Sequence, residues 1–334
     1  MRAIILDGTG HAELTHLPDP LPGPDDLVVA PAAVGICGTD LHMVEGNYAT
    51  ARYPVVPGHE FAGTVVQVGA DVAGISPGDL VGVDPNVHCG VCRWCLRKAY
   101  NLCLRLEPVG VTRHGACAER VVVPARVAYR LPPGIDATTG ALIEPLACVL
   151  HALDRAPTLK DKDVLVYGAG SIGLLMCAVA KQRGAGRIQV VEPHQVRREA
   201  ALRLGADQAA ASSTALDLDD GAEVVIEASG HAAAVSDALD RVAVRGTLVQ
   251  MGVTAPETAV ALHPFEVFEK ELTILGSNSL ADCYPTAVEQ ISGLAAVIRP
   301  LVTHTLPLTS YAEALTLAAS PEALKVHLAP SHDS

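Results

Sequence analysis

The chain has 334 residues, 49% of them hydrophobic and 18% charged, a balance typical of globular proteins and not of disordered ones. The length suits about two domains, and a formal net charge of −13 without a dense Lys/Arg run argues against a nucleic-acid partner. The N-terminal segment is interrupted by Asp7, Gly8, Gly10, His11 and Glu13, so it lacks the apolar core of a secretory signal, and we expect a cytoplasmic protein without membrane contact.

Short β segments with frequent Gly and Pro characterise the first 130 residues. Strand-like runs occupy residues 27–30, 64–68, 80–83 and 120–123. Each run is bounded by turn residues such as Pro57-Gly58. This pattern predicts a compact, barrel-like β domain.

Two polar motifs lie in this β-rich region. Residues 37–42 read Cys-Gly-Thr-Asp-Leu-His, and residues 58–60 read Gly-His-Glu. An isolated Cys is usually a packing residue, and an isolated His-Glu pair is usually surface or polar core. Together, however, Cys37, His59 and Glu60 offer a thiolate, an imidazole and a carboxylate, a set suited to zinc with an open coordination position.

Four cysteines, Cys89, Cys92, Cys95 and Cys103, lie in one short segment. Four thiolates suit the tetrahedral preference of zinc, and closed sites of this kind are structural. The alternatives are free thiols or a redox pair. In a long chain without an export signal, such a cluster more often binds metal, so we predict a structural zinc site.

Glu144 is a carboxylate inside the otherwise apolar run 142–146. Burying a carboxylate costs free energy unless it is paired or bound to a metal. The alternative interpretation is a charge at a helix N-terminus. Both interpretations stay open on the residues alone.

From Asp163 onward strand-like and helix-like segments alternate. Strand-like runs at 164–167, 187–191, 224–226, 247–249 and 272–275 are separated by helical stretches, of which 232–242 is one. This alternation predicts a doubly wound parallel sheet, and therefore an α/β protein. The last 45 or so residues predict short segments with one helix near 311–319.

A glycine-rich turn joins the first of these strands to the helix after it. The residues are Gly168, Ala169, Gly170, Ser171, Ile172 and Gly173. The first glycine permits a tight turn, and the second lets the backbone approach a pyrophosphate at the helix N-terminus. A turn that only packs helix on strand is the alternative.

Glu192 ends the next strand, about 20 residues further on. A carboxylate at this place accepts hydrogen bonds from both ribose hydroxyls and repels a 2′-phosphate, which favours NAD over NADP. Arg197 and Arg198 oppose this interpretation, because a nearby arginine can accept the phosphate.

In these motifs the chain resembles the zinc-containing medium-chain dehydrogenase/reductase family over essentially its whole length. The resemblance rests on residues 35–40, 57–63, the four-cysteine segment, 144–146 and 168–173, which occur in the family's order. Within the family the chain is most similar to the polyol (sorbitol) dehydrogenase branch, with threonine dehydrogenases close by. Alcohol dehydrogenases of the family have a cysteine where Glu144 stands.

The resemblance implies a GroES-like catalytic domain over residues 1–147, completed by 280–334, with a Rossmann NAD-binding domain over 148–279. It implies that Cys37, His59 and Glu60 bind a catalytic zinc. Glu144 is then a fourth, exchangeable ligand or a partner of the zinc-bound water. Thr39 matches the hydroxyl that takes the substrate proton, and His42 matches the relay towards solvent.

The resemblance also implies the remaining cofactor contacts and the assembly. Residues that match segments lining the nicotinamide are Met251, Gly252, Val253, Ser277 and Asn278. Arg197 matches a basic residue beside the adenosine ribose in NAD-using members. Family members are dimers or tetramers, so a homodimer or homotetramer is expected.

Two departures from the polyol branch concern the substrate. Ser279-Leu280 stand where an Arg-Tyr pair is general, and residues 113–117 replace a more usual Asp-Gly-Gly-aromatic stretch. We therefore expect a wider, less polar pocket with Leu280 as an apolar wall and Cys117 in place of an aromatic ring. Such a pocket suits a bulky or cyclic polyol, or an aminocyclitol whose amine lies near Glu144 or Asp282.

The sequence thus predicts hydride transfer between NAD and a secondary alcohol of a polyol, cyclitol or aminocyclitol. Oxidation of an amino alcohol such as threonine is the alternative within the enzyme class. A non-catalytic, cofactor-binding protein that kept the fold is the alternative outside it.

Overall fold

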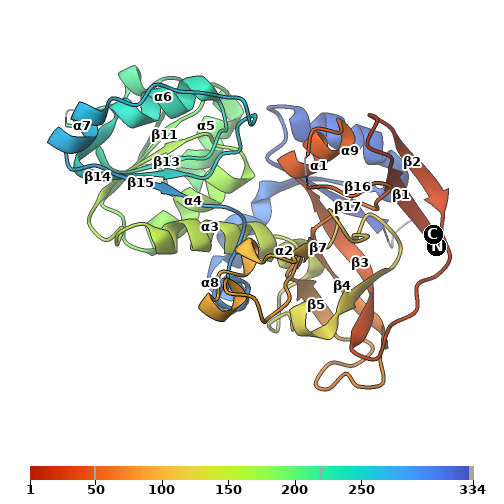
Figure 1. Ribbon diagram of the computed structural model, residues 1–334. Helices are drawn as coiled ribbons and strands as arrows, with labels where there is room; N and C mark the ends of the chain where they lie inside the picture. Colours follow the sequence, from red (N-terminus) through yellow and green to blue (C-terminus); the bar gives the residue numbers. More distant parts are fainter. Residues whose placement is uncertain (49, 219, 331–334) are drawn as a thin grey trace. The chain divides into compact units, whose positions relative to one another are not determined.

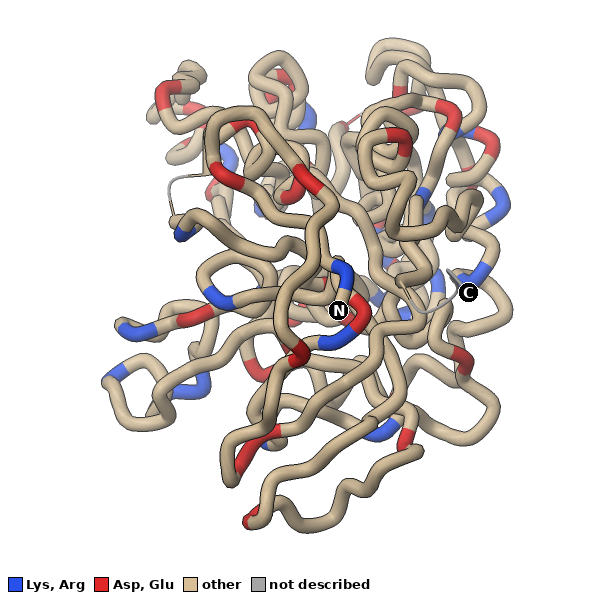
Figure 2. The backbone as a smooth tube through the Cα atoms, turned by 90° about the vertical axis from the view of Figure 1, so that its right-hand side faces the viewer, with Lys and Arg blue, Asp and Glu red and all other residues tan. Residues whose placement is uncertain are grey.

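The computed structural model describes residues 1–48, 50–218 and 220–330. The chain forms two compact units, one of Met1–Ala147 with Leu280–Ser334 and one of Cys148–Ser279. No helix in the described ranges is long and apolar enough to cross a membrane. Asp and Glu residues are dispersed along the backbone in the view of Figure 2, so the net negative charge is not confined to one segment.

The first unit is built on a seven-stranded sheet, as the predicted β-rich domain requires. The strands lie in the order β16 (Val302–Pro307), β17 (Lys325–Ala329), β3 (Asp26–Ile36), β4 (Glu60–Val68), β5 (Leu80–Val83) and β9 (Ala128–Arg130), with β8 (Val121–Pro124) paired to β3. Two small antiparallel pairs accompany it: β1 (Arg2–Leu6) with β2 (Ala12–His16), and β6 (Asn86–Val87) with β7 (Glu107–Pro108).

The C-terminal segment completes this sheet through β17. It runs antiparallel to β3, and His327 lies opposite Gly35. Val326 and Leu328 join the hydrophobic core on one side of the strand. Side chains alternate along a strand, so Lys325 and His327 share its other side, yet both are also buried.

Helices of the first unit include one that the sequence predicted and one that it did not. The expected helix near 311–319 is α9 (Tyr311–Ala319). The unpredicted helix is α8 (Tyr284–Ile298), which has a proline in its first turn and buries Ile291, Leu294 and Ile298. Its apolar residues at i, i+3 and i+7 form one helical stripe. The short helices are α1 (Gly38–Val44) and α2 (Ala137–Gly140), and α3 (Ile143–Arg155) contains the boundary between the units.

The second unit is a six-stranded parallel sheet with helices on either side (Figure 1). The strand order is β12 (Gln208–Ala210), β11 (Arg187–Val191), β10 (Asp163–Tyr167), β13 (Ala222–Glu227), β14 (Val242–Gln250) and β15 (Thr273–Gly276). The helices are α4 (Ser171–Gln182), α5 (Gln195–Arg203), α6 (Ala232–Asp240) and α7 (Pro264–Glu269). The predicted doubly wound fold is confirmed.

The strand order reverses between β10 and β13, which positions a ligand-binding edge. In open α/β sheets ligands bind outside the carboxyl ends of the strands at such a reversal. The Gly168 turn follows β10 directly, and the carboxylate of Glu227 ends β13. Both therefore lie at the edge where a dinucleotide is expected.

Candidate functional site

The four predicted zinc-binding cysteines lie together in the first unit. Their four sulfur atoms all lie within 4.8 Å of one another, in Cys89, Cys92, Cys95 and Cys103. Backbone N–H donors at Val91 and Cys92 lower the pKa of Cys89 to about 6. Zinc binds thiolates rather than thiols, so the donors and their spacing fit a closed, tetrahedral zinc site.

The segment that carries these sulfurs folds as tight turns. It contains two 3₁₀ turns, Cys95–Arg97 and Tyr100–Leu102. Gly90 has a φ of +74°, a conformation that favours glycine. The backbone N–H groups of Cys89 and Arg105 each donate to Cys103 Sγ over 3.3 Å, and such donors stabilise thiolate ligands.

A second cluster combines Cys37, Asp40 and His59. Cys37 Sγ lies 3.1 Å from His59 Nε2, and Asp40 Oδ1 lies 3.8 Å from His59 Nδ1. Asp40 was not among the predicted site residues, although it belongs to the motif that predicted Cys37. Its carboxylate faces the second ring nitrogen of His59, the arrangement by which proteins orient metal-binding histidines.

Local structure around α1 explains how Cys37 is presented. Cys37 is the N-cap of this helix, where its sulfur accepts the Thr39 N–H over 3.3 Å. Asp40 Oδ2 accepts the Cys37 N–H over 3.0 Å, which completes a capping box. The two reciprocal bonds satisfy helix-end donors and fix the direction of the Cys37 side chain.

His59 and Glu60 are placed by the glycine before them. Gly58 has a φ of +94°, and a Cβ on it would lie 2.8 Å from Cys117 Sγ. Only glycine suits that backbone and that space. The turn therefore delivers His59 and Glu60 to the start of β4, next to the end of β3 that leads to Cys37.

The electrostatics of this cluster suit a cation. Asp40 is fully buried, and burial raises the pKa of its carboxyl. Burial acts to lower the pKa of His59, but the Cys37 and Asp40 side chains outweigh it and hold that pKa well above its usual value. The Cys37 and Asp40 side chains therefore favour a positive charge at His59. A zinc ion on Cys37 and His59 would supply such a charge, so the donors present fit zinc.

The two predicted carboxylate ligands, Glu60 and Glu144, do not join the cluster that contains the predicted sulfur and imidazole ligands. Among the described residues neither Glu60 nor Glu144 belongs to the Cys37–Asp40–His59 cluster. Glu60 is instead ion-paired with Lys325, a buried partner that the sequence reasoning missed. Glu144 is buried in the first turn of α3, and its charge acts to raise the pKa of His59, which places it electrostatically near the cluster.

The expected proton relay lies on one face of α1. Thr39 is half-buried beside Cys37, and His42 is exposed. Residues three apart on a helix lie on the same face. The two side chains are therefore ordered from the cluster towards solvent, as the relay needs.

The glycine-rich turn has the geometry of a dinucleotide-binding site. Gly168 has a φ of +90°, and Gly170 is the N-cap of α4. A Cβ on Gly173 would lie so close to the carbonyl oxygen of Gly168 that a larger residue would collide with it. Each glycine thus has its own reason to be there, and the helix N-terminus is left open to an anionic group.

Glu192 is buried and fixed by backbone donors. Its carboxylate accepts the N–H groups of Ala169 over 2.8 Å and of His194 over 3.0 Å. Arg198 Nη1 donates to the Glu192 carbonyl over 2.9 Å and also contacts the next carbonyl. The guanidinium of Arg198 is therefore engaged by the backbone, while Arg197 lies in the first turn of α5.

The segments expected beside the nicotinamide follow β14 and β15 at the same sheet edge. Met251 and Gly252 donate their N–H groups to the Glu227 carbonyl over 2.9 and 2.8 Å. The Ser277 N–H donates to the Gln250 carbonyl over 2.9 Å. Val253 and Asn278 are exposed.

Glu227, which the sequence reasoning also missed, holds this edge together. It is fully buried, and its carboxylate accepts N–H groups from Ser229 and Gly230 and from the Gln250 side chain. These contacts fix the loops after β13 and β14 to one another. A charged residue at the end of an apolar strand was the available signal, the same signal that identified Glu144.

Three residues that we expect to shape the substrate pocket are buried in the core or paired with other residues. Cys117 is fully buried in the hydrophobic core of the first unit. Leu280 is fully buried too, and its carbonyl accepts a hydrogen bond from Asn86 Nδ2 over 3.0 Å. Asp282 Oδ2 lies 2.9 Å from Lys98 Nζ. Neither apolar side chain therefore presents a wall, and Asp282 already has a cationic partner.

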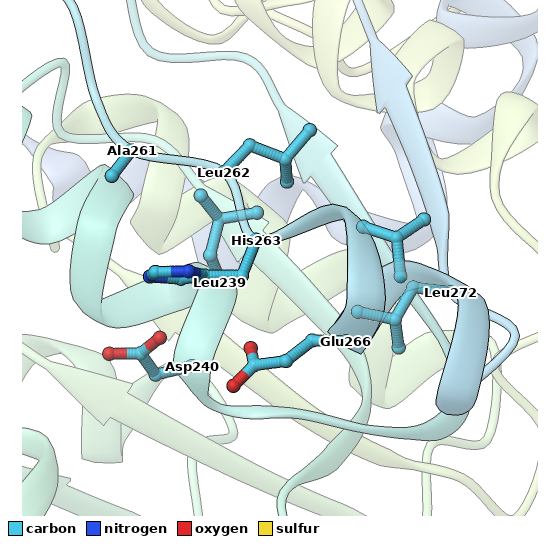
Figure 3. A pocket seen from close by; sticks show the side chains of 8 residues that line it. Leu239, Asp240, Ala261, Leu262, His263, Glu266 and Leu272 are labelled. Carbon is cyan, nitrogen blue, oxygen red and sulfur yellow. The ribbon is translucent and has the colours of Figure 1, made fainter.

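The hollow shown in Figure 3 is not a substrate site. It lies between α6 and α7 of the second unit and is lined in part by Leu239, His263 and Glu266. Its volume is about 10 Å³, room for about one water molecule. None of the predicted site residues lines it.

Comparison with known protein families matches both halves of the chain. Residues 23–133 match the alcohol dehydrogenase GroES-like domain, and residues 171–293 match the zinc-binding dehydrogenase domain. Among solved structures, a zinc-binding dehydrogenase from Sinorhizobium meliloti 1021 bound to NADP superposes with a TM-score of 0.94 at 33% identity, covering 98% of this chain and 99% of that one.

The curated relatives include dehydrogenases that are named for three different substrates. D-altritol 5-dehydrogenase of Agrobacterium fabrum is 35% identical, covering 98% of this chain and 99% of its own. Sorbitol dehydrogenase of Halalkalibacterium halodurans is 33% identical, with 99% of both chains covered. L-threonine 3-dehydrogenase of Saccharopolyspora erythraea is 34% identical, with 98% of both covered.

Proposed function

This chain belongs to the zinc-containing medium-chain dehydrogenase/reductase family, and on that basis we propose that it oxidises a secondary alcohol of a polyol, cyclitol or aminocyclitol with NAD. Zinc and a nicotinamide dinucleotide are the cofactors of such an enzyme. The observation that carries the proposal is the Cys37–Asp40–His59 cluster with Thr39 and His42 beside it on α1.

The two units take separate tasks in this proposal. Residues 1–147 with 280–334 form the GroES-like catalytic domain, and residues 148–279 form the Rossmann domain that binds NAD. Support comes from the location of the candidate metal-binding groups, since both metal clusters belong to the first unit. The glycine-rich turn and Glu192 belong to the second unit.

The chain's own residues prepare the alcohol for hydride loss. Cys37, His59 and Glu60 would hold the zinc, and Glu144 would be a fourth, exchangeable ligand or a partner of the zinc-bound water. When bound, zinc supplies Lewis acidity towards the alcohol oxygen, and the nicotinamide supplies the hydride acceptor. The Asp40 carboxylate lies on the Nδ1 side of His59, 3.8 Å away, and its charge favours the ring orientation in which Nε2 faces Cys37.

Thr39 and His42 carry the proton of the alcohol away. The Thr39 hydroxyl receives it beside Cys37, and the exposed imidazole of His42 passes it to solvent. An imidazole suits this role because one ring nitrogen can accept a proton while the other donates one. A protein that only bound the cofactor would have no use for this order of groups.

The buried carboxylate of Glu144 and the relatives support this substrate class. Altritol and sorbitol are substrates in the names of two relatives, and Glu144 stands where alcohol dehydrogenases of the family have a cysteine. Asp282 is paired with Lys98, so an aminocyclitol amine would have Glu144 as its carboxylate. L-threonine is the alternative, since threonine dehydrogenases are similarly close.

A substrate panel tests this proposal. The zinc-loaded protein is assayed with NAD at one pH against altritol, sorbitol, a cyclitol, an aminocyclitol and threonine, and kcat/KM is compared. We expect a polyol, cyclitol or aminocyclitol to exceed threonine by at least about tenfold, which is about 1.4 kcal/mol in transition-state binding. Threonine as the best substrate would assign the chain to the amino-alcohol class. Absence of NADH formation with every alcohol would favour a non-catalytic protein.

Glu192 is expected to give NAD at least about a 100-fold advantage over NADP in kcat/KM. Two like charges about 4 Å apart repel by about 4 kcal/mol at an effective dielectric constant of about 20, so a 2′-phosphate beside this carboxylate is strongly disfavoured. Glu192→Ser should narrow the preference for NAD. The measurement is kcat/KM for both cofactors at a saturating alcohol concentration.

Glu192→Gln is the matched control for the charge. It keeps the size of the side chain and an acceptor for the Ala169 or His194 N–H, but it removes the negative charge. It should narrow the gap about as much as serine does. A wild-type preference for NADP, the cofactor bound in the Sinorhizobium structure, would mean that Arg197 or Arg198 dominates the pocket.

We also propose a homodimer or homotetramer in the cytoplasm. β15 is an edge strand of its sheet, and α7 before it exposes Phe265 and Phe268. Exposed edge strands and large apolar patches are unusual on a monomer. Light scattering on the purified protein measures the assembly.

A further inference from the structure

Glu227 is a buried carboxylate that lies where β13 ends, at the edge of the sheet where the dinucleotide is expected. Its oxygens accept the Ser229 N–H over 2.8 Å, the Ser229 hydroxyl, the Gly230 N–H over 3.0 Å and Gln250 Nε2 over 2.7 Å. An ionised carboxylate only accepts hydrogen bonds, so this set of donors matches the charged form of the side chain. Hydrogen bonds to a charged acceptor are stronger than those between neutral groups, so Glu227 holds the loop after β13 and the end of β14 firmly.

Two glycines bring the loops after β13 and β14 into direct backbone contact. A Cβ on Gly252 would collide with Glu227 Oε2 and with the backbone nitrogen of Gly230. Gly230 has a φ of +72°, and a Cβ there would collide with the Val253 carbonyl oxygen. A residue without a side chain is therefore needed at both positions, and the two loops meet at the carboxylate of Glu227.

Gln250, the last residue of β14, extends this network in two directions. Its Nε2 donates to Glu227 Oε2 over 2.7 Å and to the Gly252 carbonyl over 2.8 Å. Its own carbonyl accepts the Ser277 N–H over 2.9 Å. The ends of β13, β14 and β15 are thus tied to one another through one side chain, and a buried network whose members are satisfied is rigid.

The segment after Gln250 depends on this anchor. Residues 251–263 contain neither helix nor strand before α7 begins, and a connection of this length has no secondary structure of its own to order it. Its first residues, Met251 and Gly252, donate their N–H groups to the Glu227 carbonyl over 2.9 and 2.8 Å. Glu227 therefore fixes the start of the segment through both its side chain and its main chain. A segment that is already ordered binds a ligand at a lower entropic cost.

We propose that Glu227 is a positioning residue for the nicotinamide half of the cofactor, because it holds the segments that begin at Met251 and Ser277 in the conformation that binds it. The proposal rests on the proposed function, since it assumes that NAD binds at this sheet edge with these segments beside the nicotinamide. The adenosine half has anchors of its own, the Gly168 turn and the Glu192 carboxylate. Loss of Glu227 should therefore weaken the binding of one half of the cofactor and spare the other.

The experiment compares the dissociation constants of NADH and of ADP-ribose, which lacks the nicotinamide, by calorimetric titration of the zinc-loaded protein. Glu227→Gln keeps the shape of the side chain but turns one acceptor oxygen into a donor that faces other donors. The Kd of NADH should rise by about 10- to 100-fold, the size expected for the loss of one hydrogen bond to a charged group, while the Kd of ADP-ribose changes by less than about twofold.

Two further variants keep the test independent of how well Glu227→Gln folds. Gln250→Met removes one donor and leaves the buried carboxylate in place; it should raise the Kd of NADH selectively by about 3- to 10-fold. Glu223→Gln is the matched control, the same substitution near the other end of β13, where the carboxylate is ion-paired with Lys162 Nζ over 2.8 Å. Since an exposed ion pair contributes little, both Kd values should stay within about twofold of wild type. A selective loss of NADH affinity in Glu223→Gln would overturn the proposal.

Amide exchange in the cofactor-free protein gives a second readout. The N–H groups of residues 229–230 and 251–252 should exchange at least about tenfold faster in Glu227→Gln than in wild type, because local opening becomes easier; unchanged exchange there would contradict the role of Glu227. Failure of the wild type to bind NADH would overturn the proposed function and this role with it. If the wild type binds NADH, and Glu227→Gln leaves that affinity unchanged or weakens NADH and ADP-ribose equally, only the role of Glu227 is overturned and the proposed activity stands.

Discussion

Cys37→Ser should lower kcat/KM for alcohol oxidation by at least about 1,000-fold while the protein stays folded. Zinc Lewis acidity contributes several kcal/mol to such a reaction, and each 1.36 kcal/mol is worth about tenfold in rate. Cys37 is one of the two protein groups in direct contact in the cluster, with its Sγ 3.1 Å from His59 Nε2. Its loss should also leave one zinc per chain instead of two, measured by elemental analysis.

The fold should survive because Cys37 is a cap and not a core residue. Its side chain accepts one N–H bond at the start of a seven-residue helix, and a serine hydroxyl is itself a favoured N-cap acceptor. Cys283→Ser is the matched control, since Cys283 is a partly exposed cysteine of the same unit that lies outside both metal clusters. It should retain both zinc ions and wild-type activity. Full activity in Cys37→Ser would show that the zinc site is misassigned.

Local patterns in the sequence predicted the groups that lie close together along the chain. The glycine-rich turn, Glu192 and the four cysteines each need only a short segment and a recognisable spacing. The structure gives these residues the expected geometry: Gly168 has a positive φ, and the four sulfurs lie together. Their chemistry depends on local backbone turns, which sequence spacing describes well.

Contacts between distant segments could not be predicted in the same way. Lys325 meets Glu60 only because β17 adds to β3, and no spacing in the sequence records that pairing. Strand register and sheet order decide which side chains meet, and both are set by the whole fold. Helix α8 was missed for a different reason, since its sequence contains a proline and a glycine, which suggest turns.

For the substrate pocket, the position of a residue in the sequence did not predict whether its side chain is buried. Cys117 and Leu280 stand at positions that resemble substrate-facing ones, yet both side chains are fully buried. Whether a residue faces a cavity or the core depends on the path of its backbone. The Leu280 carbonyl is held by the Asn86 side chain, a contact that a comparison of residue types does not reveal.

Cys92→Ser should lower the thermal stability of the protein by roughly 6–12 °C in Tm while kcat stays close to wild type at low temperature. Zinc binding at a closed four-thiolate site adds to the free energy of folding. A loss of only about 3 kcal/mol corresponds to that shift, because about 1 kcal/mol changes Tm by about 2–4 °C in a unit of this size. The measurement is thermal unfolding, with zinc content determined on the same sample.

The effect should extend beyond the cysteine segment because residues 86–98 contact the chain just before the start of α8. Asn86 Nδ2 donates to the Leu280 carbonyl over 3.0 Å, and Lys98 Nζ lies 2.9 Å from Asp282 Oδ2. When the zinc is lost, the segment loosens and these two contacts weaken with it. Amide exchange near 280–284 should therefore speed up in Cys92→Ser, although none of those residues is a zinc ligand.

Thiol reactivity separates the zinc interpretation from its alternatives. If the four cysteines bind zinc, they are protected from a thiol reagent in the native protein and become reactive after chelation. Free thiols would react with or without the chelator, and a redox pair would respond to a reductant instead. Cys283→Ser should leave Tm within about 2 °C of wild type, because a substitution away from such a site changes stability by about 0.5 kcal/mol or less. An equal loss of Tm in Cys92→Ser and Cys283→Ser would mean that the lost stability comes from packing and not from a metal.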